Sequence, residues 1–261
     1  MLIGLAAALL AAVLFGVAAV AQAHAARRMP SGVGLAGFVS HSVRDPLMMG
    51  VVAAYLAGFL LHAVSIWYLP LYLAQAAISL SMPITALAAI LALHERLGPA
   101  RWVAVGLVTI GLALLAIGSG DAGTAAATAG FAASLWIGLV LLLLVGTWAA
   151  RWGGGWLGML AGLGYSGSAV AVRGLATPIT ATVVVIAVSV PLLGVVAFWV
   201  YSRALDRSTV AAATGPLIVT QTFVPAAVGV LALGDGVRSW PAALVGLVLA
   251  TAATVFLSRE G

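Results

Sequence analysis

Two stretches of sequence decide the fold, LALHERLGPARW (91–102) and LALGDGVRSW (231–240). Each stretch follows a long apolar run, carries one acidic residue at the same offset, and leads through a tryptophan into another apolar run. Shifting the chain by 140 residues places Glu95 on Asp235. The same helix end therefore occurs twice, which predicts an internal repeat.

The composition places the chain in a membrane. Hydrophobic residues make up 64% of the sequence, charged residues make up 7%, and the mean hydropathy is +1.23. Soluble domains carry about 25% charged residues, so we expect lipid to surround this chain. The basic residues are arginines placed singly or in pairs, unlike the basic stripe of a nucleic-acid-binding protein. The lack of cysteine excludes disulfides, thiol catalysis and thiolate metal sites.

Nine apolar runs reach or approach the roughly 20 residues that a helix needs to cross a bilayer. They are residues 2–23, 47–67, 70–93, 102–118, 132–150, 156–172, 178–202, 209–233 and 240–258. The runs lack the alternating pattern of outer-membrane strands. We therefore predict an all-α polytopic membrane protein with nine transmembrane helices and no room for a soluble domain.

The first run also matches the sixth. Under a shift of 150 residues, LAAVLFGVAAVAQ (10–22) falls on LAGLGYSGSAVAV (160–172) with five identities in thirteen positions. The helices then form two inverted four-helix repeats joined by a central helix (4+1+4). The predicted units are residues 1–118, 119–155 and 156–261. Many secondary transporters are built in this way, with the substrate site near the middle of the membrane between the repeats.

The arginines predict the orientation. Nine of them fall in one set of alternating connections and two, Arg173 and Arg238, fall in the other. Because cytoplasmic connections carry the excess of arginine, we expect a multi-pass protein of the cell's inner (plasma) membrane. Its N-terminus is then outside and its C-terminus is cytoplasmic. The mildly apolar stretch within 24–46 is expected at the membrane interface, although a partial crossing remains an alternative.

A resemblance to a known family covers nearly the whole chain. The segment LALHERLGPARWVAVGLVTIGLALLA (91–116) resembles EamA-like proteins of the drug/metabolite transporter superfamily. The nine-helix count and YSRALDRSTVAAATGP (201–216) are more similar to its NIPA-type branch, which is named for magnesium transporters. The chain departs from the NIPA pattern in its second helix, where Phe59 and His62 replace an acidic residue and an asparagine.

Polar side chains within the apolar runs are candidates for a substrate pathway. They are Gln75, Ser79, Ser81, Thr85, Tyr165, Ser166, Thr214, Gln221 and Thr222. The 140-residue shift places Ser81 on Gln221, so the predicted symmetry brings these two together near the middle of the membrane. The alternative is that such side chains only bond neighbouring helices together.

Four prolines within the runs are candidates for gating, because proline frees a backbone carbonyl. They are Pro83, Pro191, Pro216 and Pro225, and simple kinking of the helices is the alternative. In GLGYSG (162–167) we expect the glycines to allow close helix packing. A dinucleotide site is not expected, because no strand precedes the motif. Glu95 is expected to pair locally, with Arg96 or Arg101.

These patterns lead to a secondary transporter that moves a small, amphipathic, weakly charged or lipid-like solute by alternating access. Two alternatives remain open: a transporter of Mg²⁺ or another divalent cation of NIPA type, and a flippase for lipid-linked sugars or its accessory subunit. We do not expect an enzyme, because paired carboxylates, a metal cluster and a nucleophile–base spacing are all missing. No cofactor, side-chain metal site or nucleic-acid partner is expected, and a homodimer is left open.

Overall fold

The computed structural model describes residues 2–29, 34–68, 77–78, 80–96, 98–121, 127–175 and 178–259. Within these ranges the chain forms helices and connections, without a strand. The helices are α1 (Leu2–Ala26), α2 (Leu35–Ser42), α3 (Pro46–Tyr68), α5 (Ser81–Leu93), α6 (Pro99–Gly118), α7 (Ala129–Trp148), α8 (Gly154–Arg173), α9 (Ala181–Arg207), α10 (Val210–Ala232) and α11 (Trp240–Arg259), with a short 3₁₀ helix η1 (Ala149–Arg151) after α7. The predicted all-α class is confirmed.

Six helices are long and apolar enough to cross a membrane, namely α1, α6, α7, α9, α10 and α11. A seventh crossing results if α2 and α3 are taken as one bent pair, in which the axis turns by 91°. α5 has only 13 residues, and α8 is rich in glycine and serine, which lowers its hydropathy. The membrane-spanning character is thus supported for six or seven of the nine predicted runs.

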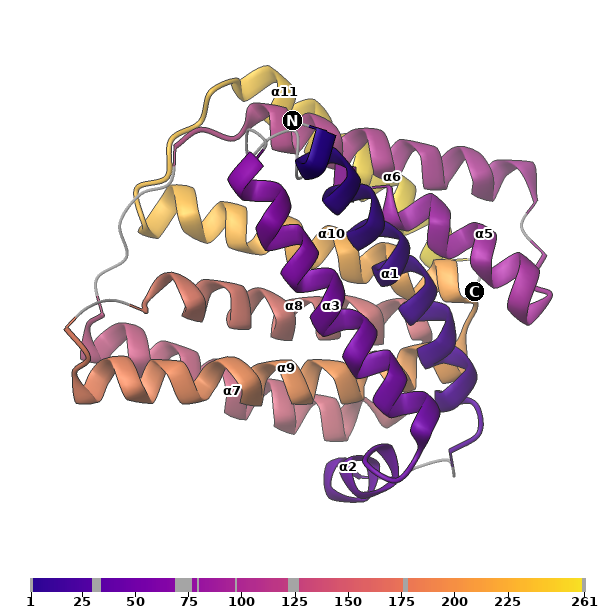
Figure 1. The fold of residues 1–261 in the computed structure, drawn as a ribbon, viewed down its shortest axis with the longest axis horizontal. Coiled ribbons are helices and arrows are strands. Elements are labelled where there is room, and N and C mark those ends of the chain that lie inside the picture. Colours follow the sequence, from indigo (N-terminus) through magenta and orange to yellow (C-terminus); the bar gives the residue numbers. More distant parts are fainter. Residues whose placement is uncertain are drawn as a thin grey trace.

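The packing of α1 resembles the packing of α8. α1 packs against α3 and α5, and α8 packs against α9 and α10. In Figure 1, α1 and α3 run side by side, while α7, α8 and α9 form a separate group. α6 packs against α11. The order of contacts is therefore the same in the two halves of the chain.

The two acidic corners share one backbone geometry. The residue before each acid has a left-handed conformation, with φ of 56° at His94 and 74° at Gly234. The amide of each acid donates to the carbonyl six residues earlier, at 3.4 Å for Glu95 and 2.9 Å for Asp235. A left-handed residue is common just after a helix C-terminus, and here the amide that follows it reaches back to a carbonyl of the last helical turns. Positions 140 residues apart thus end α5 and α10 in the same way.

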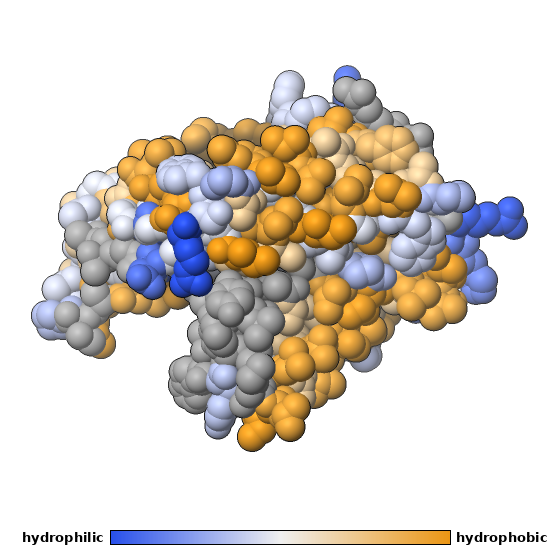
Figure 2. Space-filling model, turned by 90° about the horizontal axis from the view of Figure 1, so that it is seen from above, coloured by the Kyte–Doolittle hydropathy of each residue, from blue (hydrophilic) through white to orange (hydrophobic). Residues whose placement is uncertain are grey.

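Much of the molecular surface is apolar. Figure 2 shows hydrophobic residues over a large part of one face, and long side chains such as Leu56, Phe59 and Leu60 of α3 are more than 60% exposed. Such a surface would be a liability in water, where large exposed apolar patches lead to association. It is the surface expected of helices surrounded by lipid.

Close helix contacts are made at glycines. A Cβ atom at Gly111 of α6 would lie 2.7 Å from the carbonyl oxygen of Gly246 in α11. A Cβ at Gly162 of α8 would lie 2.7 Å from the carbonyl oxygen of Leu217 in α10. Small residues let backbones approach closely where the hydrophobic effect does not drive helices together. The expectation that the GLGYSG glycines serve packing is confirmed.

The short helix α2 lies between α1 and α3 along the chain. It has eight residues, or roughly 12 Å at 1.5 Å per residue, so it is too short to cross a bilayer by itself. Its Phe38 is buried, and the Phe38 ring lies 5.8 Å from the ring of Phe198 in α9. This contact anchors α2 against the end of the helix bundle.

Candidate functional site

The first helix of the predicted pathway is described only in part. Gln75 and Ser79 lie outside the described residues. Ser81 and Thr85 lie in α5, and both are buried. The neighbouring Met82 packs against Gly215 of α10, and no hydrogen bond joins Ser81 to Gln221 within the described ranges.

The structure brings Ser166 of α8 to the polar segment of α10. The Ser166 hydroxyl lies 2.7 Å from the Gly162 carbonyl oxygen and 3.1 Å from the Thr220 carbonyl oxygen. A Cβ at Gly162 would lie 3.3 Å from the amide nitrogen of Gln221. Thr222 donates to the Ile218 carbonyl of its own helix at 2.8 Å. Ser166 therefore contacts α10 next to Gln221, and its hydrogen bond joins the two helices.

A cavity of about 520 Å³ lies beside this contact, between α7, α8 and α10. Its lining is apolar except for three hydroxyl groups, and it consists of Thr128, Phe131, Ser134, Leu135, Leu163, Ser166, Gly167, Val170, Val224, Val228, Ala232 and Leu233. A second cavity of about 330 Å³ lies between α7, α8 and α9 and shares part of this lining. Neither lining contains a charged side chain.

The hydroxyls of the larger cavity already have backbone partners. Ser134 donates to the Phe131 carbonyl at 2.8 Å, and Ser166 donates as described above. Thr128 caps α7, and its oxygen accepts from the Phe131 amide at 3.1 Å. Since a hydroxyl oxygen has two lone pairs, these groups can still accept hydrogen bonds. The cavity therefore suits an uncharged solute with an apolar body and a hydrogen-bond donor.

Two of the predicted residues take part in other contacts. Thr214 is buried, and its hydroxyl shares a 2.6 Å hydrogen bond with the Tyr201 hydroxyl of α9. Tyr165 is half-buried and packs against the main hydrophobic core. Thr214 thus bonds α9 to α10. Bonding between neighbouring helices is the alternative that the sequence analysis gave to a role in the substrate pathway.

The four prolines lie in different environments. Pro191 lies inside α9, and Pro216 and Pro225 lie inside α10. Because proline lacks an N–H, Pro225 leaves the Gln221 carbonyl without its usual helical donor. Pro83 is the third residue of α5, where an N–H would have no helical partner in any case.

A buried polar cluster around Gln22 was missed by the sequence reasoning. Gln22 is fully buried in α1. Its Nε2 donates to Ser202 Oγ at 2.8 Å and lies 3.4 Å from the Phe198 carbonyl oxygen. Its Oε1 accepts from the Tyr55 hydroxyl at 3.0 Å. The signal for this cluster was the single amide in the otherwise apolar run 2–23, and it joins α1, α3 and α9.

Replacing Gln22 by methionine is expected to lower the free energy of unfolding by about 1–2 kcal/mol. The change keeps the side-chain volume but leaves Tyr55 and Ser202 short of a buried partner. Unfolding in detergent micelles, followed by circular dichroism, measures the effect. Tyr55→Phe removes one hydrogen bond and should cost less, and an unchanged stability in both variants would contradict a structural cluster.

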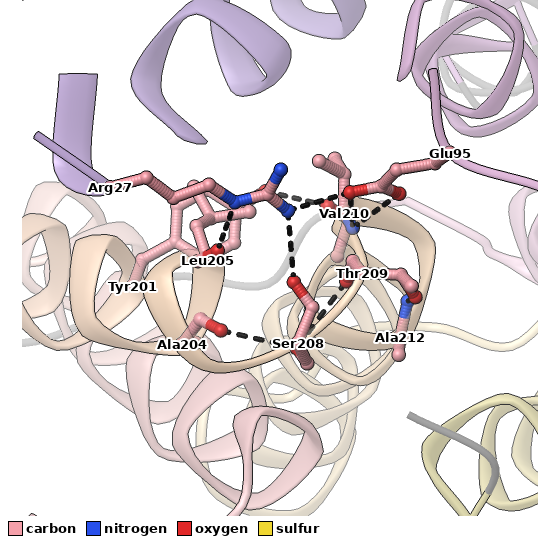
Figure 3. Close-up of polar contacts among 10 residues, drawn as sticks. Arg27, Glu95, Tyr201, Ala204, Leu205, Ser208, Thr209, Val210 and Ala212 are labelled. Carbon is pink, nitrogen blue, oxygen red and sulfur yellow. Dashed lines mark hydrogen bonds and ion pairs between the residues drawn. The ribbon is translucent and has the colours of Figure 1, made fainter. Parts of the chain in front are cut away.

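Charged groups meet where α1, α5, α9 and α10 come together (Figure 3). Arg27 Nη2 lies 2.6 Å from Glu95 Oε1. The same guanidinium donates to the carbonyl oxygens of Leu205 at 3.2 Å and Ser208 at 3.1 Å. The Glu95 oxygens accept from the Val210 amide at 3.0 and 3.2 Å. We call these five residues the Arg27–Glu95 junction.

The charges of the Arg27–Glu95 junction are opposite in sign to the dipole ends of the helices that they contact. Val210 is the first residue of α10, where free N–H groups and the helix dipole favour a carboxylate. Arg27 follows the end of α1 and contacts carbonyl groups at the end of α9, where a cation is favoured. From the sequence we expected Glu95 to pair locally, with Arg96 or with Arg101. That expectation is wrong, because the ion partner of Glu95 is Arg27. The Glu95 carboxylate reaches Arg27, 68 positions away in the chain, and Val210, 115 positions away.

A second ion pair lies at the other acidic corner. Arg173 is the last residue of α8, and two of its nitrogens lie 2.7 and 3.0 Å from the two carboxylate oxygens of Asp235. Two parallel hydrogen bonds of this kind fix the geometry of both groups. A Cβ at Gly229 would overlap the Asp235 carboxylate, so glycine makes room for it there. Glu95 thus binds an arginine that follows α1, and Asp235 binds an arginine that ends α8.

The two ion pairs lie at opposite ends of α10. Glu95 contacts its first residue, Val210, and Asp235 follows its last turn. α10 has 23 residues, or roughly 35 Å at 1.5 Å per residue, which exceeds the roughly 30 Å of a bilayer core. The two acidic corners are thus separated by the thickness of a membrane.

No group of three His, Asp or Glu side chains that could hold a metal ion occurs within the described ranges. The polar groups that the structure does assemble are hydroxyls, amides, backbone carbonyls and two arginine–carboxylate pairs. Comparison of the chain with models of protein families, with curated proteins and with solved structures finds no match.

Proposed function

We propose that the protein is a secondary transporter that works by alternating access between two inverted repeats. The observation that carries the proposal is the pair of acidic corners. Corners of the same geometry, 140 residues apart, lie at opposite ends of α10. A repeat whose equivalent points lie on opposite sides of a membrane has inverted topology, which is the construction of many transporters.

The proposed architecture has nine helices in a 4+1+4 arrangement. α1, α3, α5 and α6 form the first repeat, α7 is the central helix, and α8 to α11 form the second repeat. The similar packing of α1 and α8 supports this division. We place the chain with the EamA-like drug/metabolite transporters, closest to the NIPA-type branch. The end that carries the Arg27–Glu95 junction faces the cytoplasm, which puts the N-terminus outside.

The proposed substrate is a small amphipathic solute without a full charge. It binds in the cavity between α7, α8 and α10, whose lining holds apolar side chains and hydroxyl oxygens. A volume of about 520 Å³ falls in the range of small-molecule sites. An ion would lose its hydration shell there without charged ligands to replace it, so the lining favours the uncharged solute over Mg²⁺.

A ligand-stabilisation screen of the purified protein tests the substrate class. The screen compares Mg²⁺, amino acids, neutral and cationic amphipathic compounds, and polyprenyl phosphates. A bound ligand raises the melting temperature by mass action, and we expect neutral or weakly basic amphipathic compounds to do so. Stabilisation by Mg²⁺ alone would instead support cation transport, and stabilisation by polyprenyl phosphates alone would support a flippase for lipid-linked sugars.

Filling the cavity is expected to stop flux of the stabilising compound into proteoliposomes. Val228→Trp places an indole ring in the cavity lining and should reduce flux at least about tenfold, because the ring takes the place of the solute. Val188→Trp is the matched control, since Val188 is exposed on α9 outside the cavity. Equal flux in the two variants would remove the cavity from the pathway. If flux survives in the double variant Ser81→Ala, Gln221→Ala, these two residues are not part of the substrate pathway.

A further inference from the structure

Three arginines lie at the end of the bundle where α7 and α9 end. Arg203 and Arg207 stand in the last turns of α9, and their spacing of four residues puts them on one face of that helix. Arg151 is the last residue of η1, which follows α7 directly. A backbone carbonyl between the two arginines of α9 accepts from Arg27, so all three lie on the membrane face of the junction. We call Arg151, Arg203 and Arg207 the Arg203 cluster.

Both arginines of α9 reach across to the end of α7, which runs beside α9 (Figure 1). Arg203 Nη1 donates to the Gly146 carbonyl oxygen at 2.6 Å, and Arg207 Nη1 donates to the Trp152 carbonyl oxygen at 3.3 Å. Gly146 lies in the last turn of α7, where carbonyls lack helical donors and a cation is favoured. These bonds fix the direction of the two side chains, and each uses one of the five N–H donors of a guanidinium.

Among the residues that the structure describes, no carboxylate forms an ion pair with the Arg203 cluster. Asp206 precedes Arg207 on α9, but it is exposed, and within the same part of the chain it pairs with neither arginine of that helix. Arg27 and Arg173, at other helix ends, each have a carboxylate partner. Because a charge at a low-dielectric boundary is costly without a counter-ion, an anion is the partner that the cluster would gain.

Tryptophans mark the depth of the cluster in the membrane. Trp148 ends α7 and Trp156 lies in the first turn of α8, and both are more than half exposed. The rings of Trp148 and Trp152 meet edge to face at 6.1 Å. Tryptophans gather where the hydrocarbon core meets the headgroups. Arg203 stands four residues before the end of α9, or roughly 6 Å at 1.5 Å per residue, so its guanidinium lies at the level of the lipid phosphates.

The Arg203 guanidinium is held in place from two sides. Its central carbon lies 5.0 Å from the centre of the Trp199 ring, which is buried, and an aromatic face attracts a cation. The Gly146 carbonyl fixes one of its nitrogens. Within the described ranges its other N–H groups have no hydrogen-bond partner. A guanidinium held in this way can bind a phosphate through two parallel hydrogen bonds, because its planar fork matches the phosphate oxygens.

We propose that the Arg203 cluster binds the phosphate group of an anionic phospholipid. Arg203 and Arg207 bind the phosphate oxygens, and Arg151 adds positive charge beside them. The proposed orientation puts this face in the cytoplasmic leaflet, which carries anionic lipids, and basic pockets between helices on that side bind such headgroups. The site requires a membrane-spanning bundle and does not depend on transport.

The surface next to the cluster favours a lipid over a free phosphate. Leu141 and Leu144 are exposed on α7, and with Trp148 they form one apolar stripe at spacings of three and four residues. Leu141 also lines the second cavity, which is apolar apart from Ser134. The acyl chains of a lipid bound at the cluster therefore lie along this stripe, whereas a soluble phosphate gains nothing from it.

Native mass spectrometry of the delipidated protein in a neutral detergent tests the site. The probes are phosphatidylglycerol, phosphatidylcholine with the same acyl chains, and inorganic phosphate as a competitor. We expect phosphatidylglycerol to bind the unchanged protein at least about fivefold more tightly than phosphatidylcholine, whose own cation offsets its phosphate. Inorganic phosphate at the same concentration should not displace phosphatidylglycerol, because it lacks the acyl chains.

The double variant Arg203→Gln, Arg207→Gln is expected to bind phosphatidylglycerol about tenfold or more weakly, since each arginine near an anionic headgroup contributes several-fold. Arg28→Gln with Arg44→Gln is the matched control. It removes the same charge from two exposed arginines at the same end of the bundle, and it should weaken binding less than about twofold, because neither belongs to the cluster.

Equal weakening in the two double variants would refute the site, because binding would then follow the total charge of this face. A lower melting temperature with unchanged phosphatidylglycerol affinity would also refute it, since the arginines would then only cap α7. Equal affinity for the two lipids, or displacement by inorganic phosphate, would overturn the anionic lipid as the ligand. Should the Arg203 double variant fail to fold, Arg151→Gln with Arg207→Gln decides in its place, because both side chains are exposed.

Discussion

Gly158→Leu is expected to prevent stable folding of the protein. A Cβ at Gly158 of α8 would overlap the carbonyl oxygen of Ala213 in α10. That oxygen belongs to a helix backbone, so it cannot move aside as a flexible side chain could. α8 and α10 form one of the closest helix pairs in the bundle, and separating them would also break the Ser166 hydrogen bond to Thr220. We expect a loss of about 3 kcal/mol or more, as for other overpacked cores.

The yield of monodisperse protein in detergent and its melting temperature measure this effect. Gly194→Leu is the matched control, because a Cβ at Gly194 of α9 meets nothing within 4 Å. A leucine there removes the helix penalty of glycine and adds no clash. Gly158→Ala should already cost stability, since the Cβ alone makes the overlap. Equal stability of the Gly158 and Gly194 variants would show that α8 and α10 do not approach as described.

Glu95→Ala is expected to lower the free energy of unfolding by about 2–3 kcal/mol. The substitution removes the ion partner of Arg27 and the acceptor of the Val210 amide together. Breaking a buried pair costs about 3–5 kcal/mol and an exposed pair less than about 1 kcal/mol. This pair lies between those limits, because Glu95 is 8% exposed and Arg27 is 33% exposed.

Asp206→Ala is the matched control for Glu95→Ala. Asp206 is an exposed carboxylate near the same end of the molecule, and its loss should change the stability by less than about 0.5 kcal/mol. Asp235→Ala should fall between the two, since both members of its pair are partly exposed, at 20% and 33%. Denaturation in mixed micelles gives all three values. The same small change for Glu95 and Asp206 would reduce the junction to a surface contact.

The predictable part of the fold depended on local properties of the chain. Apolar length identified the helices, and the acidic corners at 91–102 and 231–240 identified equivalent helix ends with the same backbone geometry. The glycines of GLGYSG (162–167) were correctly assigned to packing. These features follow from hydropathy, helix-end chemistry and side-chain size, each of which acts within a few residues.

The candidate site was predictable only in part. Ser166 and the polar segment of α10 do meet, but the cavity beside them also involves α7, on which the sequence analysis named no candidate residue. Gln22 was overlooked, because an amide near the end of an apolar run gives no sign of its partners. Whether it meets lipid or a neighbour depends on the rotation and depth of α1 relative to α3 and α9.

The sequence by itself determined that this protein is an apolar, all-helical chain with two equivalent acidic corners. Only the tertiary structure decided what those corners bind. Glu95 reaches Arg27 and Val210 across the bundle, whereas Asp235 folds back over Gly229 to meet Arg173. The physical reason is that a helix end is specified by neighbouring residues, but a charge in a low-dielectric bundle takes whatever partner the packing of distant helices brings within hydrogen-bond reach.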